Sequence, residues 1–476
     1  MSEKSTSAKN KELFSGMAIY AIGTFGTKLL SFLIVPLYTY YITTSDMGTY
    51  DLLHSAMSVL TPIVTLQISD AAYRWMIRKE NIEGSIEATI QVLFINSVIF
   101  SGLILLFNLF IPIPFCHYFI GLLITSRALQ TIQKLLRGLN NKKLFAISSI
   151  LYSAIYLGLN VLQICVLQVG VVSLFLSQII SNILTIIFIV CLDRRLFRNY
   201  FKPINFPFVK ELISVSAPLV PNLLNWWVMS SSDRFIISFA INSAANGIYA
   251  ISCKFPSFLH LVLNLFTTSW QDLSIADKEK DGTYYSKVFE KLYIFSFTII
   301  PVIIAATQLY IVLLMSPAYH EAARYVAFLY MGTIFQVFSS FYGVGYVREK
   351  KTKNASLTSI YGAIINFVVN IGLIYFIGLY AAAISTFAGF LVMWLIREHQ
   401  NRDELQILID KQKFVTYFTI ACIFSSVSSI FNVYADFIFF ALGAAYFLIV
   451  NRKDLKSILS SVTRKIHKKK VQKQHV

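Results

Sequence analysis

Five basic side chains lie inside long apolar stretches of this sequence, where charges are least expected. They are Lys28, Arg127, Arg234, Lys254 and Arg324. A charged side chain at the centre of a bilayer costs roughly 2.5–3.5 kcal/mol on insertion scales, so its presence indicates either a function or a buried partner. Arginine offers phosphate and carboxylate oxygens a planar fork, and lysine offers them a compact point charge. The set is therefore a candidate site for an anionic ligand.

Polar residues accompany these charges at helical spacing. Thr24 and Ser31 share a helix face with Lys28, and His54 lies on a polar stripe of the next apolar stretch. Such faces avoid lipid and point to protein or to a wet cavity. We expect a substrate-binding cavity formed by Lys28, Arg127, Arg234, Lys254, Arg324, His54, Ser58 and Ser257.

Each of these residues also has a structural interpretation. Arg234 or Lys254 would be neutralised by pairing with Asp51, and Arg127 by bonding to backbone carbonyls in a protein core. His54 is equally compatible with a buried histidine that has no contact with a ligand. The sequence alone leaves both interpretations open.

Composition places these residues in a polytopic membrane protein. The chain has 476 residues, of which 56% are hydrophobic and only 14% charged, and its mean hydropathy is +0.64. Soluble proteins have about 25% charged residues. The five cysteines form no C-x-x-C pair, so we interpret them as small hydrophobic residues. The net charge of +17 lies in tails and connections, which argues against nucleic-acid binding.

About fourteen apolar stretches are long enough to cross a bilayer as helices. We predict them at 14–42, 48–72, 86–111, 115–137, 144–168, 170–192, 209–241, 246–270, 288–315, 321–346, 355–377, 379–397, 414–431 and 434–451. All but the five basic residues named above lie in the two tails, in the connections that follow even-numbered helices, or at the span ends that border those connections. Positive connections stay in the cytoplasm, so both termini are predicted to be cytoplasmic.

An internal repeat divides the predicted helices into two parallel sets. Gly48 and Tyr50 match Gly247 and Tyr249 at an offset of 199 residues. Two-lobed transporters of this kind bind substrate between the lobes and rock around it. The predicted organisation is a cytoplasmic tail over 1–13, a six-helix lobe over 14–192, a linker over 193–208, a six-helix lobe over 209–397, a helix pair over 414–451 and a basic cytoplasmic tail over 452–476.

Several motifs resemble those of Wzx-type polysaccharide flippases, in the multidrug/oligosaccharidyl-lipid/polysaccharide exporter superfamily. The resemblance runs from Leu13 to Lys453. It is carried by the opening helix GTFGTKLLSFLIVPLYTYYIT, the turn Ser45-Asp-Met-Gly-Thr-Tyr50, Gln67 to Arg74 and Gly378 to Thr386.

The resemblance implies an alternating-access flippase of the bacterial cytoplasmic (inner) membrane. Its substrate would be an undecaprenyl-pyrophosphate-linked oligosaccharide, moved from the inner to the outer leaflet for O-antigen or capsule assembly. The implied central cavity is cationic and takes Lys28, Arg234 and Lys254 from this chain, and the last helix pair would form a groove for the lipid tail. A polysaccharide polymerase and other assembly proteins are implied partners.

Other functions remain to be weighed against this one. A peptidoglycan-precursor flippase is closely related, whereas a multidrug exporter of the same superfamily would need carboxylates for cationic drugs. A membrane-embedded glycan polymerase would need catalytic residues on a large outer loop, and the outer turns here are short. No nucleotide-binding, metalloprotease or hydrolase motif is present, so we predict a non-enzyme without a cofactor. Coupling to protons, to sodium or to the membrane potential stays open.

Overall fold

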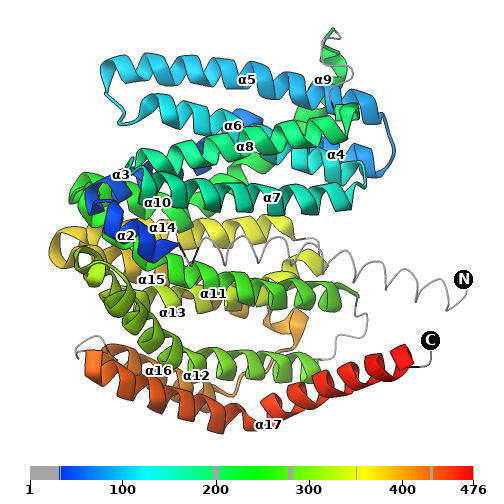
Figure 1. Cartoon of the computed structure of the whole chain (residues 1–476). Helices are drawn as coiled ribbons and strands as arrows, with labels where there is room; N and C mark the ends of the chain where they lie inside the picture. The colour runs from blue at the N-terminus through cyan, green and yellow to red at the C-terminus, as the bar shows by residue number, and fades with distance from the viewer. Residues whose placement is uncertain are drawn as a thin grey trace, which may run out of the picture. The chain divides into compact units, whose positions relative to one another are not determined.

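The described residues of the computed structural model are helical and contain no strand (Figure 1). They comprise residue 32 and residues 34–196, 203–276, 282–349, 351–428 and 433–474. Among them, nine helices are long and apolar enough to span a membrane, or eleven if two bent pairs each count as one span. The predicted all-helical membrane fold is confirmed. Lys28 and most of the first predicted span lie outside the described residues.

The chain forms two compact units. Unit 1 comprises residues 1–254 and 367–382, and unit 2 comprises 255–366 and 383–476. The helices of unit 1 are α2 (Val35–Tyr41), α3 (Thr44–Thr65), α4 (Ile68–Ile77), α5 (Ile82–Phe110), α6 (Cys116–Gly138), α7 (Lys142–Val161), α8 (Val172–Leu192), α9 (Phe206–Ser216), α10 (Val220–Ala240) and the first part of α11 (Ser243–Ala276). A short π-helical turn, Leu162–Val166, extends α7.

Every predicted span after the first overlaps a helix or a helix pair, although α6 and α16 are not among the helices that are apolar enough to count as spans, and two of the predicted spans are broken. The span predicted over 48–72 divides into α3 and α4, which meet at an angle of 56°. Leu66 and Gln67, at the break, have φ angles of 48° and 53° in the left-handed region. Asn96 of α5 donates its amide N–H to the carbonyl of Val64 at 2.8 Å, so protein replaces a bond that the break removes. The span over 209–241 bends by 49° near Pro218 and Pro221.

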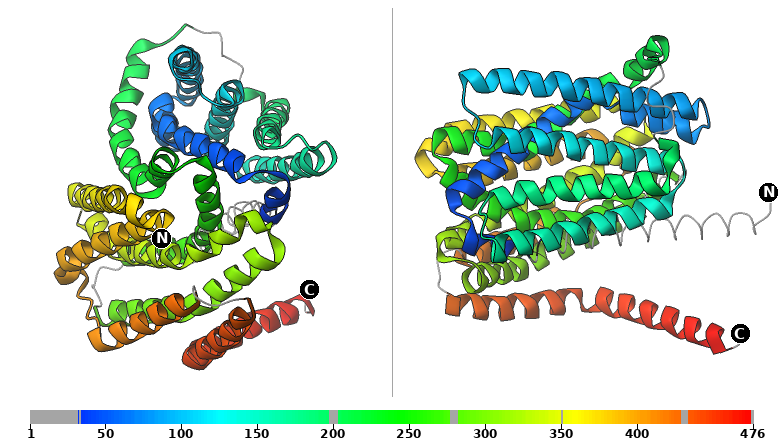
Figure 2. Two further views of the ribbon diagram at one scale, coloured as in Figure 1. Left: turned by 90° about the vertical axis from the view of Figure 1, so that its left-hand side faces the viewer. Right: turned by 45° about the horizontal axis from the view of Figure 1, so that its top comes forward.

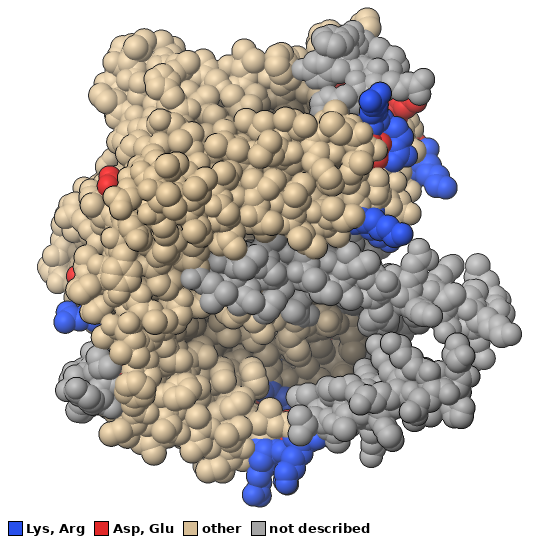
Figure 3. Space-filling model, in the orientation of Figure 1, with Lys and Arg blue, Asp and Glu red and all other residues tan. Residues whose placement is uncertain are grey.

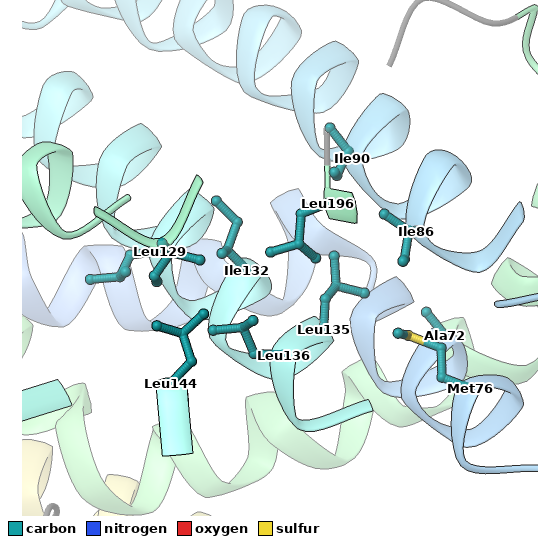
Figure 4. Close-up of a cluster of buried hydrophobic side chains, with 11 residues drawn as sticks. Ala72, Met76, Ile86, Ile90, Leu129, Ile132, Leu135, Leu136, Leu144 and Leu196 are labelled. Atoms are coloured by element: carbon teal, nitrogen blue, oxygen red, sulfur yellow. The ribbon is translucent and has the colours of Figure 1, made fainter. Parts of the chain in front are cut away.

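A buried apolar cluster holds α4, α5, α6, α7 and α8 together at one end of unit 1 (Figure 4). Its residues include Met76, Ile86, Leu135 and Leu136, and the last two are completely buried. The two views of Figure 2 show α6, α7 and α8 running side by side. Outside this cluster, α5 exposes a long series of large apolar side chains from Phe94 to Phe110, which suits contact with lipid acyl chains.

Charged side chains of unit 1 gather at the ends of its helices. On the face shown in Figure 3, most Lys and Arg visible on the upper part lie at its right-hand end, and uncharged surface covers the length of the helices. This distribution is the one expected of membrane-spanning helices.

Unit 2 is built from the rest of α11, α12 (Gly282–Leu314), a 3-10 segment η4 (Pro317–Arg324), α13 (Val326–Arg348), most of α14 (Thr352–Ile377) and of α15 (Leu379–Leu405), α16 (Lys411–Ser428) and α17 (Val433–Gln474). The end of α14 and the start of α15, residues 367–382, belong to unit 1. Aromatic side chains fill its core. Trp270 stacks on Phe341 with ring centroids 4.1 Å apart and donates its indole N–H to the Phe341 carbonyl. Helix α17 continues without a break past residue 451, where the sequence predicted the end of the last span.

Two glycines bring α3 and α11 into backbone contact. A Cβ atom on Gly48 would lie 1.7 Å from the carbonyl oxygen of Ser243, and one on Gly247 would lie 1.9 Å from that of Thr44. Each pair, Gly48 with Gly247 and Thr44 with Ser243, is separated by the same 199 residues as the sequence repeat. The contact is therefore reciprocal, as it is when equivalent segments meet across a two-fold axis.

Replacing Gly48 with alanine should lower the thermal unfolding temperature of the detergent-solubilised protein, because the new methyl group meets backbone that has no space to move. Gly158, in the middle of α7, has nothing within 4 Å of the corresponding position. Gly158→Ala is the matched control and should be neutral or stabilising by up to about 1 kcal/mol. Equal unfolding temperatures for the two variants would contradict the close contact.

Candidate functional site

A polar cavity lies inside unit 1 between α3, α6, α7 and α8. Its volume is about 390 Å³, within the roughly 300–1,000 Å³ of typical small-molecule sites. It is lined by His54, Met57, Ser126, Arg127, Leu129, Gln130, Gln133, Phe145, Ala146, Ser149, Tyr152, Gln178 and Asn182. These residues recur three or four positions apart on each helix, so one face of each helix is polar in a largely apolar bundle. We call this space the upper cavity.

A second cavity of about 260 Å³, the lower cavity, shares part of this wall. Arg127, Gln130, Gln133 and Phe145 line both. The lower cavity also contacts Gln67, at the break between α3 and α4. Irregular backbone at membrane depth is tolerated where it lines a polar cavity. The lower cavity therefore accounts for the broken helix at this position.

Arg127 lies at the junction of the two cavities. Its side chain is only 7% exposed. One guanidinium nitrogen donates to Oε1 of Gln130 at 2.9 Å, and the Nε atom has no hydrogen-bond partner among the described residues. A guanidinium has five N–H donors, so most of its hydrogen-bonding capacity is available to a polar occupant of the cavities.

The other cations around the lower cavity are already engaged. Lys134 forms an ion pair of 2.5 Å with Asp70, which lies in the first turn of α4. The guanidinium of Arg137 lies over the rings of Tyr73 and Phe145, at 5.4 and 5.8 Å from their centroids. Arg127 is thus the cation that the described part of the wall leaves least compensated.

His54 marks the place where several predicted site residues come together. It is exposed and lines the upper cavity, and three cations, Lys254, Arg127 and Arg234, and one carboxylate, Asp51, act on its imidazole. Lys254 is half-buried, and its ammonium has no hydrogen-bond or ion-pair partner within the described ranges. Unit 1 therefore concentrates positive charge around one end of the upper cavity.

The guanidinium of Arg234, unlike the ammonium of Lys254, is already bound to protein partners. Its Nε atom pairs with Oδ2 of Asp51 at 3.3 Å, and another guanidinium nitrogen donates to the Ser230 carbonyl at 2.6 Å. This is the structural alternative that the sequence left open. The neighbouring Asp233 is also engaged, because it accepts hydrogen bonds from Tyr249 and Asn370.

The remaining predicted site residues are less closely placed. Ser58 is exposed and donates to the Ser55 carbonyl at 2.7 Å. Ser257 belongs to unit 2. Arg324 was predicted inside a span, and this is wrong: it is exposed at the end of η4, before α13 begins at Val326. The 3-10 segment starts with Pro317, a residue suited to a first helical position, and the α-helix begins only after Tyr325.

Sequence reasoning missed two groups of residues. The first is the set of amide side chains on the cavity wall, Gln130, Gln133, Gln178 and Asn182, whose i, i+3 and i+4 spacing was the available signal. The second is Arg397 of α15, which is 5% exposed in unit 2. It donates to Thr358, Ser359 and the carbonyls of Ser339 and Ala355, so its role is structural.

The chemistry available here is the binding of an anion with hydroxyl groups, or of another polar anion. No aspartate or glutamate is found among the described lining residues of either cavity. The described residues also contain no group of three His, Cys, Asp or Glu side chains that would hold a metal ion. A buried guanidinium surrounded by neutral amides and hydroxyls attracts a negatively charged, hydrogen-bonding ligand.

This fold is that of all-helical membrane transporters. A solved structure of the lipid II flippase MurJ in an inward closed conformation is similar with a TM-score of 0.69 and 12% identity, over 93% of this chain and 100% of that chain. An inward-facing multidrug resistance MATE family transporter of the MOP superfamily is similar with a TM-score of 0.63 and 13% identity, over 82% and 98% of the two chains. At these identities the likeness shows the fold alone.

The family is shown by the sequence itself. Residues 13–270, more than half of the chain, match the family model described as "Polysaccharide biosynthesis protein". The chain belongs to this family. No curated protein sequence matches it significantly.

Breaking the Arg234–Asp51 pair from either side should destabilise the protein by about 1–3 kcal/mol, because each single change strands a partly buried charge. Asp51→Asn, Arg234→Gln and the double variant form a cycle that thermal or denaturant unfolding can measure. The double variant should lose less stability than the sum of the single variants. Strict additivity would show that the pair does not form.

Proposed function

We propose that this protein is a flippase for a lipid-linked oligosaccharide. It would move an undecaprenyl-pyrophosphate-linked repeat unit from the inner to the outer leaflet of the bacterial cytoplasmic membrane, for surface polysaccharide assembly. The observation that carries the proposal is the buried, incompletely bonded guanidinium of Arg127 in a polar cavity, in a transporter fold of a polysaccharide biosynthesis family.

The energetics of an anionic lipid headgroup support this function. An inside-negative membrane potential favours outward movement of an anion by roughly 2.3 kcal/mol per charge for each 100 mV. The main barrier is then the dehydration of the headgroup within the membrane. A fixed cation such as Lys254 lowers that barrier because it replaces part of the lost hydration.

The wider set of predicted contacts remains part of the proposal. Lys28, Lys254, His54, Ser58 and Ser257 would contact the substrate during alternating access, whereas Arg324, exposed at the end of η4, would not. Coupling to protons, to sodium or to the membrane potential is compatible with the proposal, and a polysaccharide polymerase is the proposed downstream partner.

Lipid II is the second candidate substrate, because the likeness to the lipid II flippase MurJ extends over 93% of this chain. A multidrug exporter is less well supported. Cationic drugs require available carboxylates, and Asp51, Asp70 and Asp233 of unit 1 are each bonded to a protein partner.

Reconstitution provides the test. Proteoliposomes would contain a polyprenyl-pyrophosphate-linked oligosaccharide with a fluorophore on the glycan, and a membrane-impermeant reductant would report its movement between leaflets. Arg127→Gln should slow movement by about tenfold or more, the loss expected for a charge-assisted contact.

Arg324→Gln is the matched control, because it removes an exposed arginine of unit 2, and it should keep the wild-type rate. Movement no faster than in protein-free vesicles would reject the proposal. Faster movement of lipid II than of the oligosaccharide lipid would favour the second candidate.

Single-cysteine accessibility labelling in intact cells, on a background that lacks the native cysteines, tests the proposed orientation. Cysteines at positions 45 and 243 should react with an impermeant maleimide from outside. Cysteines at positions 142 and 351 should react only after the cells are permeabilised, because the basic connections remain in the cytoplasm. Labelling of any of these four positions from the opposite side would contradict the proposed orientation.

A further inference from the structure

We propose that the upper cavity binds a carboxylated sugar ring, so that the transported glycan contains a hexuronic acid or a sugar of the same chemistry. This inference rests on the proposed function and adds the substrate feature that the cavity selects. It follows from the charge, the hydrogen-bonding pattern and the size of the cavity wall.

The charge of the wall fits one negative charge. Arg127 donates one hydrogen bond to Gln130 and has no carboxylate partner among the described residues, while Lys134 is paired with Asp70. A sugar carboxylate carries a single charge, and its two oxygens match the fork of a guanidinium. A phosphate group carries about −1.5 to −2 charges and would need more cations than the cavity junction supplies.

The amide groups favour a ligand that donates hydrogen bonds. The Asn182 amide N–H groups donate to Ser126 at 3.1 Å and to Thr125 at 3.2 Å. The amide of Gln178 likewise donates to the hydroxyl of Tyr50, and that of Gln133 to the hydroxyls of Ser148 and Ser149. The carbonyl oxygens of these three amides receive no hydrogen bond from the described residues, so they are acceptors for a ligand.

Sugar hydroxyls supply donors for these carbonyl oxygens, whereas a fully ionised phosphate or pyrophosphate has no donor to offer them. The same ligand must therefore combine hydroxyl donors with one anionic acceptor for Arg127. A hexuronic acid has both on one six-membered ring.

The remaining wall is flat and apolar. Tyr152 lies parallel to Tyr156, with an angle of 2° between the rings and 6.0 Å between their centroids, and Tyr152 lines the cavity together with Phe145. Such surfaces suit the C–H face of a sugar ring. A volume of about 390 Å³ suits one or two sugar rings rather than a whole repeat unit.

The test is a titration of the purified full-length protein in detergent with free monosaccharides, followed by saturation-transfer difference NMR. D-Glucuronate should bind about tenfold more tightly than D-glucose, and its methyl ester should bind like glucose because the ester removes the charge. This comparison needs no variant. Inorganic pyrophosphate, added as a competitor, should displace glucuronate only weakly.

Variants then locate the site. Arg127→Gln should weaken glucuronate binding by about tenfold and leave glucose binding unchanged. Arg324→Gln should bind both sugars like the wild type. Arg127→Lys keeps the charge without the fork and should retain an intermediate preference. Thermal unfolding of each variant establishes that it is folded.

Three outcomes would overturn the inference: equal binding of glucuronate and its methyl ester, tighter binding of pyrophosphate than of glucuronate, or an unchanged glucuronate preference in folded Arg127→Gln. The flipping assay separates this failure from failure of the proposed function. Equal flipping of lipid-linked glycans with and without a uronic acid would reject the inference and keep the flippase. Glucuronate binding without movement of either lipid would reject the flippase.

Discussion

A guanidinium that is withdrawn from water must find partners for its N–H groups, and this requirement shapes both units. Arg397 meets it within the protein, through hydroxyls and carbonyls of α13 and α14. Arg127 does not: the described residues give it one acceptor, and the rest of its surroundings is a cavity. The same side chain is thus fully bonded within the protein in one unit and borders a cavity with few protein partners in the other.

The irregular backbone of unit 1 borders the same cavity system. A continuous helix would satisfy its own carbonyls and leave no irregular backbone at the lower cavity. The break at Leu66 and Gln67 is stabilised by the Asn96 side chain, and it brings Gln67 to the lower cavity. The α3 hydroxyls of Thr61 and Thr65 return to the carbonyls of Met57 and Thr61, so they cover polar groups near the bend. The cavity and the broken helix therefore form one arrangement.

The sequence predicts the helices well because each span is an apolar run of about 20 residues, a length that the bilayer imposes. It predicts the bends poorly, since a left-handed Gln67 carries no signal comparable to a glycine. Hydropathy ended one span at Arg397, but α15 continues to Leu405, and this extension returns the arginine to the protein interior. The cavity amides were missed because a glutamine in an apolar run shows only that one face is polar. Which faces meet is decided by packing between α6, α7 and α8, which is non-local.

The acidic residues of unit 1 are paired in a way that leaves positive charge uncompensated in its polar interior. Asp51 neutralises Arg234, Asp70 neutralises Lys134, and Asp233 accepts from an amide and a phenol. These contacts use up the described carboxylates near the cavities and leave Arg127 and Lys254 without one. The Arg234–Asp51 pair also joins α10 to α3, the helix that meets α11 at Gly48 and Gly247. Because the ion pair and the glycine contact both fix α3, any motion that separates α3 from α10 and α11 must break a partly buried ion pair as well as backbone packing. An anionic ligand near Arg234 would reduce the cost of that step, because the freed guanidinium would gain a new partner.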